Sequence, residues 1–399
     1  MPWEVTYPVR ERKLLVRAFA TGRYTITELA EAFGVSRKTA AKWIHRSDEE
    51  GPDGLLDRSR APHRHPNATP EAVVAAVLRK KDAHRTWGPL KLLSSPEDPV
   101  EVRENWPAPS TRGLILSRAG YTQPRRRKRH VPPSSFPFSS CREPNAVWCT
   151  DFKGWFRTQD GRRCDPLTVM DAHSRMLLCC RAVPRPDYAH VRAAFEDVFE
   201  EYGLPAAIRT DNGPPFASVA AGGLSPLAAW WVKLGIRPER IAAGHPEQNG
   251  RHERMHETLK LECCKPPAET IAAQQARFDA FRQVYNEERP HQALELRPPA
   301  SSYRPSTRPY RRAELEDLLL PDGAAIRRVR SNGEIKWRGS KLFISEALIG
   351  EAVAITETEL GHDVHFGPIL LGHLHGGQER LIRPLTPTRR SRSVTHVPG

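Results

Sequence analysis

Three acidic residues stand where they could hold metal ions. Asp151 ends the apolar segment NAVWCTDF, Asp211 directly follows the apolar segment AAIRT, and Glu253 lies in a helical segment after a loop rich in Gly, Pro and Asn. Carboxylate oxygens are preferred ligands of Mg²⁺ and Mn²⁺. If the two apolar segments are neighbouring strands, the three residues could hold two ions roughly 3.5 to 4 Å apart, an arrangement suited to phosphodiester cleavage.

Each acidic residue also has an ordinary structural explanation. Asp211-Asn212-Gly213 is a common turn sequence. Glu253 taken alone would be a solvated helix residue, because it shares one helical face with Glu257 and Lys260. The presence of all three carboxylates in this order is what favours catalysis.

Other reactive side chains in the same region are expected to play no catalytic part. Because metal-bound water would serve as the base, the histidines are expected on the surface or facing a nucleic acid. These histidines are His173, His245, His252 and His256. Cys149 is expected to be a packed thiol, and Trp230 and Trp231 are expected to pack a helix rather than stack on bases.

The elements that must position the carboxylates alternate between strands and helices. The segment PLTVMDAHSRMLLCCRAV predicts two strands joined at residues 171–174, beside the strand that carries Asp151. The segment AHVRAAFEDVFEEYG predicts an amphipathic helix ended by Gly203. Its apolar stripe comprises Val191, Phe195, Val198, Phe199 and Tyr202. Residues 145–261 are therefore expected to form an α/β core whose sheet is covered by helices.

The first helical block, TITELAEAFGVSRKTAAKWIHR, predicts a helix-turn-helix. Ala30 is expected at the packing point, Gly34 in the turn and Ser36 at the cap of the second helix. That helix would present three cations to the DNA major groove. They are Arg37, Lys38 and Lys42. The alternative is a small helical hairpin with a solvated basic face.

A second helical block follows, with helix caps expected at Thr69 and Ser110, and a second helix-turn-helix is the simplest interpretation. The basic run after it, Arg125-Arg126-Arg127, is either a solvated linker or a segment that tracks the phosphate backbone. Near the carboxyl end, Asn332-Gly333 between two alternating segments predicts a hairpin within a small β domain.

Composition limits the function classes. The 399 residues carry 61 Lys and Arg against 47 Asp and Glu, for a net charge of +14, which favours a polyphosphate partner. The seven cysteines show no Cys-x-x-Cys pair, which argues against a zinc ribbon or a disulfide framework. Since no long apolar run or amino-terminal signal is present, we expect a soluble, unexported, cytoplasmic protein.

Four motifs together resemble the DDE transposases of bacterial insertion sequences, members of the retroviral integrase superfamily with a ribonuclease H-like fold. They are TDF, RTDNGPPFAS, GHPEQNGRHERMHETLK and YNEERPHQAL. The resemblance implies that Asp151, Asp211 and Glu253 are the metal-binding catalytic triad. It further implies that Lys260 contacts the terminal DNA and that Gln248 and Asn249 lie in a mobile loop near the scissile phosphate.

Two features depart from the family pattern. The interval between Asp211 and Glu253 is longer than the spacing for which the superfamily is often named, and the extra length falls in SVAAGGLSPLAAWWVKLG. We expect this segment to bulge out without moving Glu253. The zinc-binding amino-terminal module of retroviral integrases has no counterpart here, and the helix-turn-helix blocks take its place.

The resulting architecture is multidomain. All-α helix-turn-helix modules precede an α/β ribonuclease H-like core with a mixed sheet, and a small β-barrel-like domain follows. The expected bounds are 1–58 and 59–122 for the helical domains, 123–143 for a basic linker, 144–305 for the core, 306–323 for a linker and 324–399 for the β domain.

The sequence therefore predicts a transposase that binds the terminal inverted repeats of its own element. With Mg²⁺ or Mn²⁺, as two ions, it would hydrolyse the element end and join it to target DNA. Its expected partners are repeat DNA, target DNA and further copies of itself, on the bacterial nucleoid. Two alternatives stay open: a noncatalytic or inactivated DNA-binding regulator, and a metal-dependent nuclease that cuts without joining.

Overall fold

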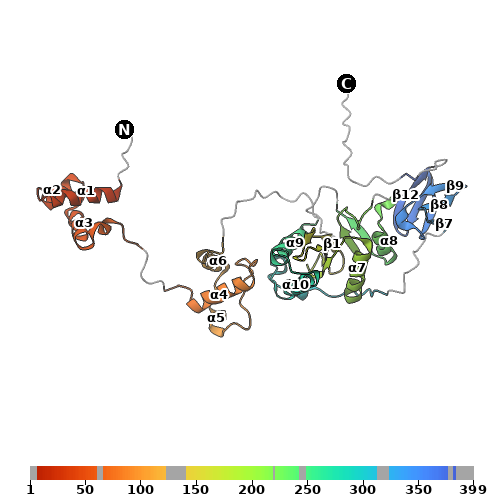
Figure 1. The fold of residues 1–399 in the computed structure, drawn as a ribbon, viewed down its shortest axis with the longest axis horizontal. Coiled ribbons are helices and arrows are strands. Elements are labelled where there is room, and N and C mark those ends of the chain that lie inside the picture. The colour runs from red at the N-terminus through yellow and green to blue at the C-terminus, as the bar shows by residue number, and fades with distance from the viewer. Residues whose placement is uncertain are drawn as a thin grey trace, which may run out of the picture. The chain divides into compact units, whose positions relative to one another are not determined.

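The computed structural model describes residues 7–60, 66–122, 141–218, 221–241, 249–311, 323–375 and 381–382. The chain forms two compact units, Met1–Thr69 and Pro70–Gly399 (Figure 1). Within these described residues, no helix is both long enough and apolar enough to cross a membrane.

The first unit is a small helical domain. It contains α1 (Pro8–Ala20), α2 (Ile26–Ala32), α3 (Arg37–Glu50) and the short helix η1 (Gly51–Leu55). The predicted turn is confirmed, because Gly34 has a φ of +63° between α2 and α3 and Ser36 caps α3 by accepting from the Thr39 amide. Ala30 is buried at 5% exposure against α1 and α3, as expected for the packing point.

The second unit opens with three further helices, α4 (Glu71–Ala83), α5 (Val100–Glu104) and α6 (Pro109–Arg118). Both predicted caps are wrong. Pro70 precedes α4 and makes no side-chain cap, so Thr69 lies one residue too early. Helix α6 begins at Pro109, whose fixed φ suits the first helical position, so Ser110 lies inside the helix.

A mixed sheet forms the centre of the second unit. In the described residues it comprises β1 (Trp148–Phe152), β2 (Phe156–Arg157), β3 (Arg163–Asp171), β4 (Leu177–Val183), β5 (Ala207–Thr210) and β6 (Arg237–Arg240). The order is β2-β3-β1-β5-β6, and β4 also pairs with β3. Strand β1 runs antiparallel to β3 and parallel to β5, and β6 continues parallel to β5. The predicted strands are thus confirmed, and β1 is internal to the sheet.

Helices cover both faces of this sheet (Figure 1). On one face lie α7 (Tyr188–Tyr202) and α8 (Pro226–Lys233), and on the other lie α9 (Gly250–Cys263) and α10 (Ile271–Gln283). The predicted apolar stripe of α7 is buried throughout, and Gly203 ends the helix with a φ of +75°.

The segment expected to bulge out does not do so. It contains η2 (Ala221–Gly223) and α8, and α8 is buried along almost its whole length. Trp231 is fully buried against Phe195, and Trp230 lies over Phe199. The two tryptophans therefore pack a helix, as predicted, but that helix is part of the core because six apolar side chains leave it no solvated face.

Short helical turns follow α10: η4 (Val284–Glu288), η5 (Gln292–Leu294) and η6 (Pro299–Ser302). Asn286 in η4 is buried and bonds β4 in both directions, since its amide oxygen accepts from the Leu177 amide and its Nδ2 donates to the Leu177 carbonyl. This pair holds the YNEERPHQAL segment against the sheet.

The last described part is rich in strands. It contains β7 (Ala325–Arg328), β8 (Glu334–Trp337), β9 (Ser340–Phe343), η7 (Glu346–Leu348), β10 (Ala352–Thr358), β11 (Gly361–Phe366) and β12 (Ile369–His375). One sheet has the order β12-β11-β10-β7, and β8 pairs only with β9. The β-rich character is confirmed, whereas a closed barrel is not: the described strands form an open sheet and a separate hairpin.

The predicted hairpin forms at the next turn along the chain and not at Asn332-Gly333. Asn332-Gly333 makes a tight turn, in which the Arg330 amide donates to the Glu334 carbonyl, but the flanking segments do not form a ladder. The hairpin instead turns at Arg338-Gly339, where both residues have positive φ. Strand β7 pairs instead with β10, with Arg328 opposite Ala352 and Ala325 opposite Ile355.

Candidate active site and nucleic-acid interface

Two aspartates lie side by side at one edge of the mixed sheet. Asp151 is near the end of β1, and Asp211 directly follows β5. The two strands run parallel, with Cys149 opposite Arg209, so that the same register brings Asp211 opposite Asp151. Because carboxyl ends of neighbouring parallel strands meet at one edge, both carboxylates reach the same place.

Local hydrogen bonds orient the two carboxylates. Asp151 Oδ1 accepts from the Phe152 amide at 2.8 Å, and Asp211 Oδ1 accepts from the Gly213 amide at 3.2 Å. The second bond is the turn geometry expected of Asp-Asn-Gly. A Cβ at Gly213 would lie 3.0 Å from Asp211 Oδ2, so this glycine leaves room for the carboxylate. The turn and the site are thus the same structure.

Helix α9 brings the third carboxylate. Glu253 lies in its first turn and is exposed, as are Glu257 and Lys260, which share its face. The buried residues His252, His256 and Leu259 instead face the sheet. At about 100° per residue, these two sets occupy different faces of the helix.

The carboxylates act on one another electrostatically. Burial, together with the negative charges of Asp211 and Glu253, raises the pKa of Asp151 to about 7, against the opposing effects of the Phe152 amide and Lys153. A carboxyl group with this pKa is half protonated at neutral pH. Perturbation by burial together with like charges is typical of functional carboxylates.

His252 and His256 were expected on the surface or facing nucleic acid, and this expectation is wrong. Both are buried, at 0% and 6% exposure, and both Nε2 atoms lie 2.7 Å from Thr168 Oγ1. Burial lowers the pKa of His252 to about 3 and that of His256 to about 2, so both rings are neutral. His256 Nδ1 is 3.9 Å from Asp151 Oδ2, too far for a hydrogen bond, so the pair is not an ion pair.

Thr168 joins this histidine pair to the acidic site. It lies opposite Asp151 on β3, and its hydroxyl is 3.0 Å from the Asp151 carbonyl oxygen. Sequence reasoning missed this network, although His252, His256 and Leu259 are spaced as the buried face of a helix. The neutral histidines therefore anchor α9 to β3, and the Thr168 hydroxyl extends this contact to Asp151 on β1.

The remaining candidates near the site behave differently from one another. His173 is half-buried and its Nδ1 lies 3.2 Å from the Cys141 carbonyl oxygen, while His245 lies outside the described residues. Cys149 is fully buried, and burial raises the pKa of its thiol to about 12, which confirms a packed thiol.

No group of three His, Cys, Asp or Glu side chains within the described residues is already gathered around a single ion position. The donors nevertheless fit a divalent cation in their chemistry. Asp151 and Asp211 supply hard oxygen ligands, and the repulsion that raises the pKa of Asp151 would be relieved by positive charge. Asp151 and Asp211 are thus the residues best suited to bind the cation. Glu253 is close enough to raise the pKa of Asp151 through its charge.

The predicted DNA-contacting residues fall into three groups. On α3, Arg37, Lys38 and Lys42 are exposed, as a recognition helix requires. Lys260 is exposed on α9, whereas Asn249 is 4% exposed with an unbonded Oδ1, so its predicted contact with DNA gains no support. Arg125, Arg126, Arg127 and Gln248 lie outside the described residues.

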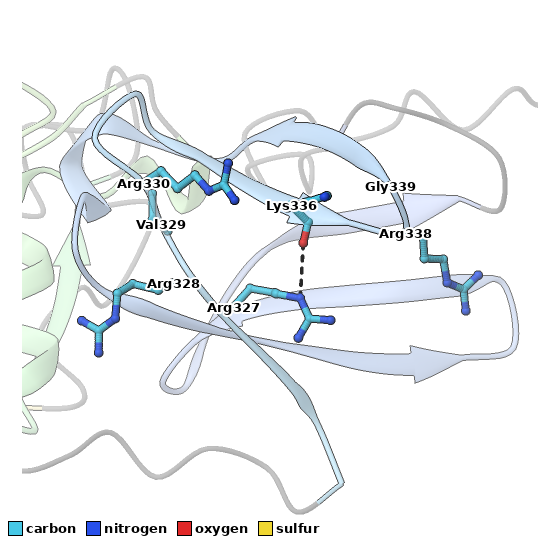
Figure 2. A pocket seen from close by; sticks show the side chains of 7 residues that line it. All are labelled: Arg327, Arg328, Val329, Arg330, Lys336, Arg338 and Gly339. Carbon is cyan, nitrogen blue, oxygen red and sulfur yellow. Dashed lines mark hydrogen bonds between the residues drawn. The ribbon is translucent and has the colours of Figure 1, made fainter.

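A basic hollow in the β-rich part was not predicted. It has a volume of about 560 Å³ and lies between β7 and the β8–β9 hairpin. Its cationic lining comprises Arg327, Arg328, Arg330, Lys336 and Arg338 (Figure 2). Arg327 Nε donates to the Lys336 carbonyl at 3.2 Å, and this bond joins the cationic residues of β7 to those of β8. The sequence signal was present in the alternation of RRVR and KWRGSK around the turn.

A mixed sheet with paired acidic strand ends and helices on both faces defines an integrase-type core. Family models agree: an integrase core domain matches residues 142–246 and a second model of that description matches 234–299. A helix-turn-helix domain model matches residues 11–63.

Two of the relatives are insertion-element proteins. An uncharacterized 31.7 kDa protein of insertion element IS407 from Burkholderia multivorans is 31% identical over 238 residues, which cover 59% of this chain and 82% of that protein. A 39.2 kDa protein of IS476 from Xanthomonas euvesicatoria is 28% identical, over 62% of this chain and 69% of that protein.

Among solved structures, the HTLV-2 integrase catalytic core domain in complex with magnesium covers 41% of this chain and 99% of its own, at 15% identity and a TM-score of 0.31. The family assignment rests on the sequence relatives instead. This chain belongs to the insertion-sequence transposases of the retroviral integrase superfamily, with a helix-turn-helix domain and a ribonuclease H-like core.

Proposed function

We propose that this chain is a DNA transposase that binds the terminal inverted repeats of its element and cuts and joins DNA with Asp151, Asp211 and Glu253. The observation that carries the proposal is the electrostatic coupling at the edge of the sheet. Two aspartates occupy equivalent positions on parallel strands, and the charges of Asp211 and Glu253 both raise the pKa of Asp151.

The carboxylates would hold Mg²⁺ or Mn²⁺, most simply as two ions. When bound, such ions supply the positive charge that activates the attacking oxygen and steadies the leaving oxygen in phosphodiester chemistry. The chain itself supplies position. The Phe152 amide fixes Asp151 Oδ1, and the Gly213 amide fixes Asp211 Oδ1. Asp151 would hold a cation in its deprotonated form, because only the carboxylate is a good ligand.

The rest of the chain would supply DNA affinity. Arg37, Lys38 and Lys42 on α3 would read or hold the repeat in the major groove. The hollow between β7 and the β8–β9 hairpin would add nonspecific phosphate contacts, as would Lys260 and the basic run at 125–127. Because two element ends must be brought together, the active form is proposed to be a homo-oligomer on DNA in the cytoplasm.

The test incubates purified full-length protein with a labelled duplex of the element end and a supercoiled plasmid, in Mg²⁺ or Mn²⁺ against EDTA. Three proteins are compared: the wild type, Glu253→Gln and Glu257→Gln. The last is a matched control, because Glu257 is exposed on the same face of α9, one turn further along.

Metal-dependent joined product that is lost in Glu253→Gln and kept in Glu257→Gln supports the proposal. Cutting without joining would instead assign a nuclease. Binding without cleavage in either metal would assign a DNA-binding regulator or an inactivated transposase. Joined product that is kept in Glu253→Gln would remove Glu253 from the proposed triad.

A further inference from the structure

A second basic hollow lies against α9, away from the acidic site. Its volume is about 310 Å³, and it is formed where α9 meets the turns after α10, the β3–β4 connection and the helical block at 70–122. Its cationic lining comprises Lys91, Arg175, Arg251, Arg254 and Arg289, and the ring of His291 also lines it. We call it the α9 hollow. Part of this lining is the YNEERPHQAL motif, for which the proposed chemistry has no use.

The α9 hollow and the acidic site use opposite faces of one helix. Arg251, Arg254 and Thr258 recur at helical spacing and line the hollow. At about 100° per residue, Glu253 and Lys260 lie roughly half a turn away from that face. A helix is about 10 Å across, so a nucleic acid that reaches Glu253 has phosphates within reach of the α9 hollow.

Acids of the described residues pair with only some of the cations of the α9 hollow. Glu262 accepts from Arg289 at 3.0 Å, which neutralises one of them. Within the part of the chain that the structure describes, Lys91 and Arg254 have no ion-pair partner. Burial, followed by the charge of Arg289, lowers the pKa of Lys91 to about 8, and the charge of Glu262 opposes this shift.

Two polar atoms in the same lining also lack partners. Arg175 Nε and His291 Nε2 are buried and make no hydrogen bond with any described residue. Burial and the charges of Lys91, Arg289 and Arg175 lower the pKa of His291 to about 3, so its ring is neutral. An unsatisfied buried guanidinium N–H such as that of Arg175, beside crowded cations, is costly unless an anion completes the site.

We propose that the α9 hollow binds a phosphate group of the DNA backbone and holds the strand on the face of α9 opposite Glu253. Guanidinium groups suit this ligand, since their planar forks match phosphate oxygens. Lys91 comes from the helical block at 70–122 and Arg254 from the core, so one phosphate would fasten these two parts together. The inference rests on the proposed function in one respect, namely that the chain handles DNA.

The test measures affinity for the labelled element-end duplex as a function of salt, with the full-length protein in EDTA. The variant is Lys91→Gln with Arg254→Gln. The matched control is Arg103→Gln with Lys265→Gln, which also removes one charge from the helical block and one from the core, at exposed positions away from the hollow. Thermal unfolding of both proteins establishes that they are folded.

The slope of log affinity against log salt should decrease by about 1 in the variant and stay unchanged in the control, because one phosphate is no longer neutralised. Replacing single backbone phosphates by methylphosphonate then locates the contact. At one position the replacement weakens binding of the wild type and leaves binding of the variant unchanged.

A variant whose salt slope equals that of the control overturns the inference. Inorganic phosphate titrated into each protein separates the two sources of a phosphate group. If the wild type binds it, the variant does not, and the DNA slopes agree, the hollow takes a free phosphate and the DNA assignment is wrong. A wild type that fails to bind the duplex refutes the proposed function itself, which is a different outcome.

Discussion

Asp151 should destabilise the metal-free protein at neutral and alkaline pH, and Asp151→Asn should therefore stabilise it. The folded protein holds the proton of Asp151 more tightly than the unfolded chain does, because burial and two neighbouring carboxylates raise the pKa from 3.8 to about 7. Between these pH values the folded state binds more protons, so the free energy of unfolding falls as pH rises through that window.

The size of this effect follows from the pKa. The difference between 3.8 and about 7 corresponds to about 4 kcal/mol, since one pKa unit is about 1.4 kcal/mol. Asn at position 151 keeps an oxygen for the Phe152 amide and carries no charge. The variant should be more stable than the wild type by about 4 kcal/mol at pH 8 and by about 2 kcal/mol at pH 5.

Thermal unfolding in EDTA at pH 5 and pH 8 measures the difference. A gain of about 4 kcal/mol corresponds to a rise in Tm of about 10 °C for a unit of this kind. Asp279→Asn, at an exposed position of α10, is the control and should shift Tm little at either pH. If Asp151→Asn lowers Tm at pH 8, or raises it equally at both pH values, the assignment of burial and repulsion to Asp151 is wrong.

Three further predictions concern the rest of the chain. Thr168→Val should lower the free energy of unfolding by about 1 to 3 kcal/mol in urea, because two buried imidazoles lose their partner, and Thr168→Ser should restore most of it. Arg37→Ala with Lys42→Ala should weaken repeat binding and reduce its salt slope by about 2 without changing Tm; unchanged binding would show that α3 is not the recognition helix. Ser36→Ala should destabilise the first unit by about 1 kcal/mol in chemical unfolding, and Ser36→Thr should be nearly neutral, because the cap of α3 depends on the hydroxyl.

The acidic sheet edge could be predicted from the sequence because its signals are local. An apolar strand that runs into a carboxylate appears at Asp151 and again at Asp211, and a parallel sheet brings such ends together. The turn at Gly34 and the cap at Ser36 are local in the same sense, and both were predicted correctly.

Features that depend on distant partners could not be predicted in this way. Thr168 and His252 are 84 residues apart, so the sequence near either one does not indicate their contact. Because two residues of the buried face of α9 are histidines, that face does not appear as an apolar stripe in the sequence. Asn332-Gly333 is a stronger local hairpin signal than Arg338-Gly339, yet β7 is taken by β10 and the hairpin forms at the later turn. In both cases tertiary pairing overrides the local pattern.

The helix α9 carries Glu253 on one face, buried histidines on a second face and Arg254 on a third. The hydroxyl of Thr168 connects the buried histidines to the strand of Asp151. Thr168 Oγ1 contacts His256 on the helix and the carbonyl oxygen of Asp151 on β1, so the strand and the helix share a buried anchor. The position of Glu253 relative to Asp151 is therefore set from inside the protein, by neutral groups that do not compete with a cation. The face of α9 that carries Arg254 and lines the α9 hollow is therefore not needed to position the carboxylates. A change at Thr168 should consequently disturb the geometry of the carboxylates, whereas a change at Arg254 should alter only how the helix meets DNA.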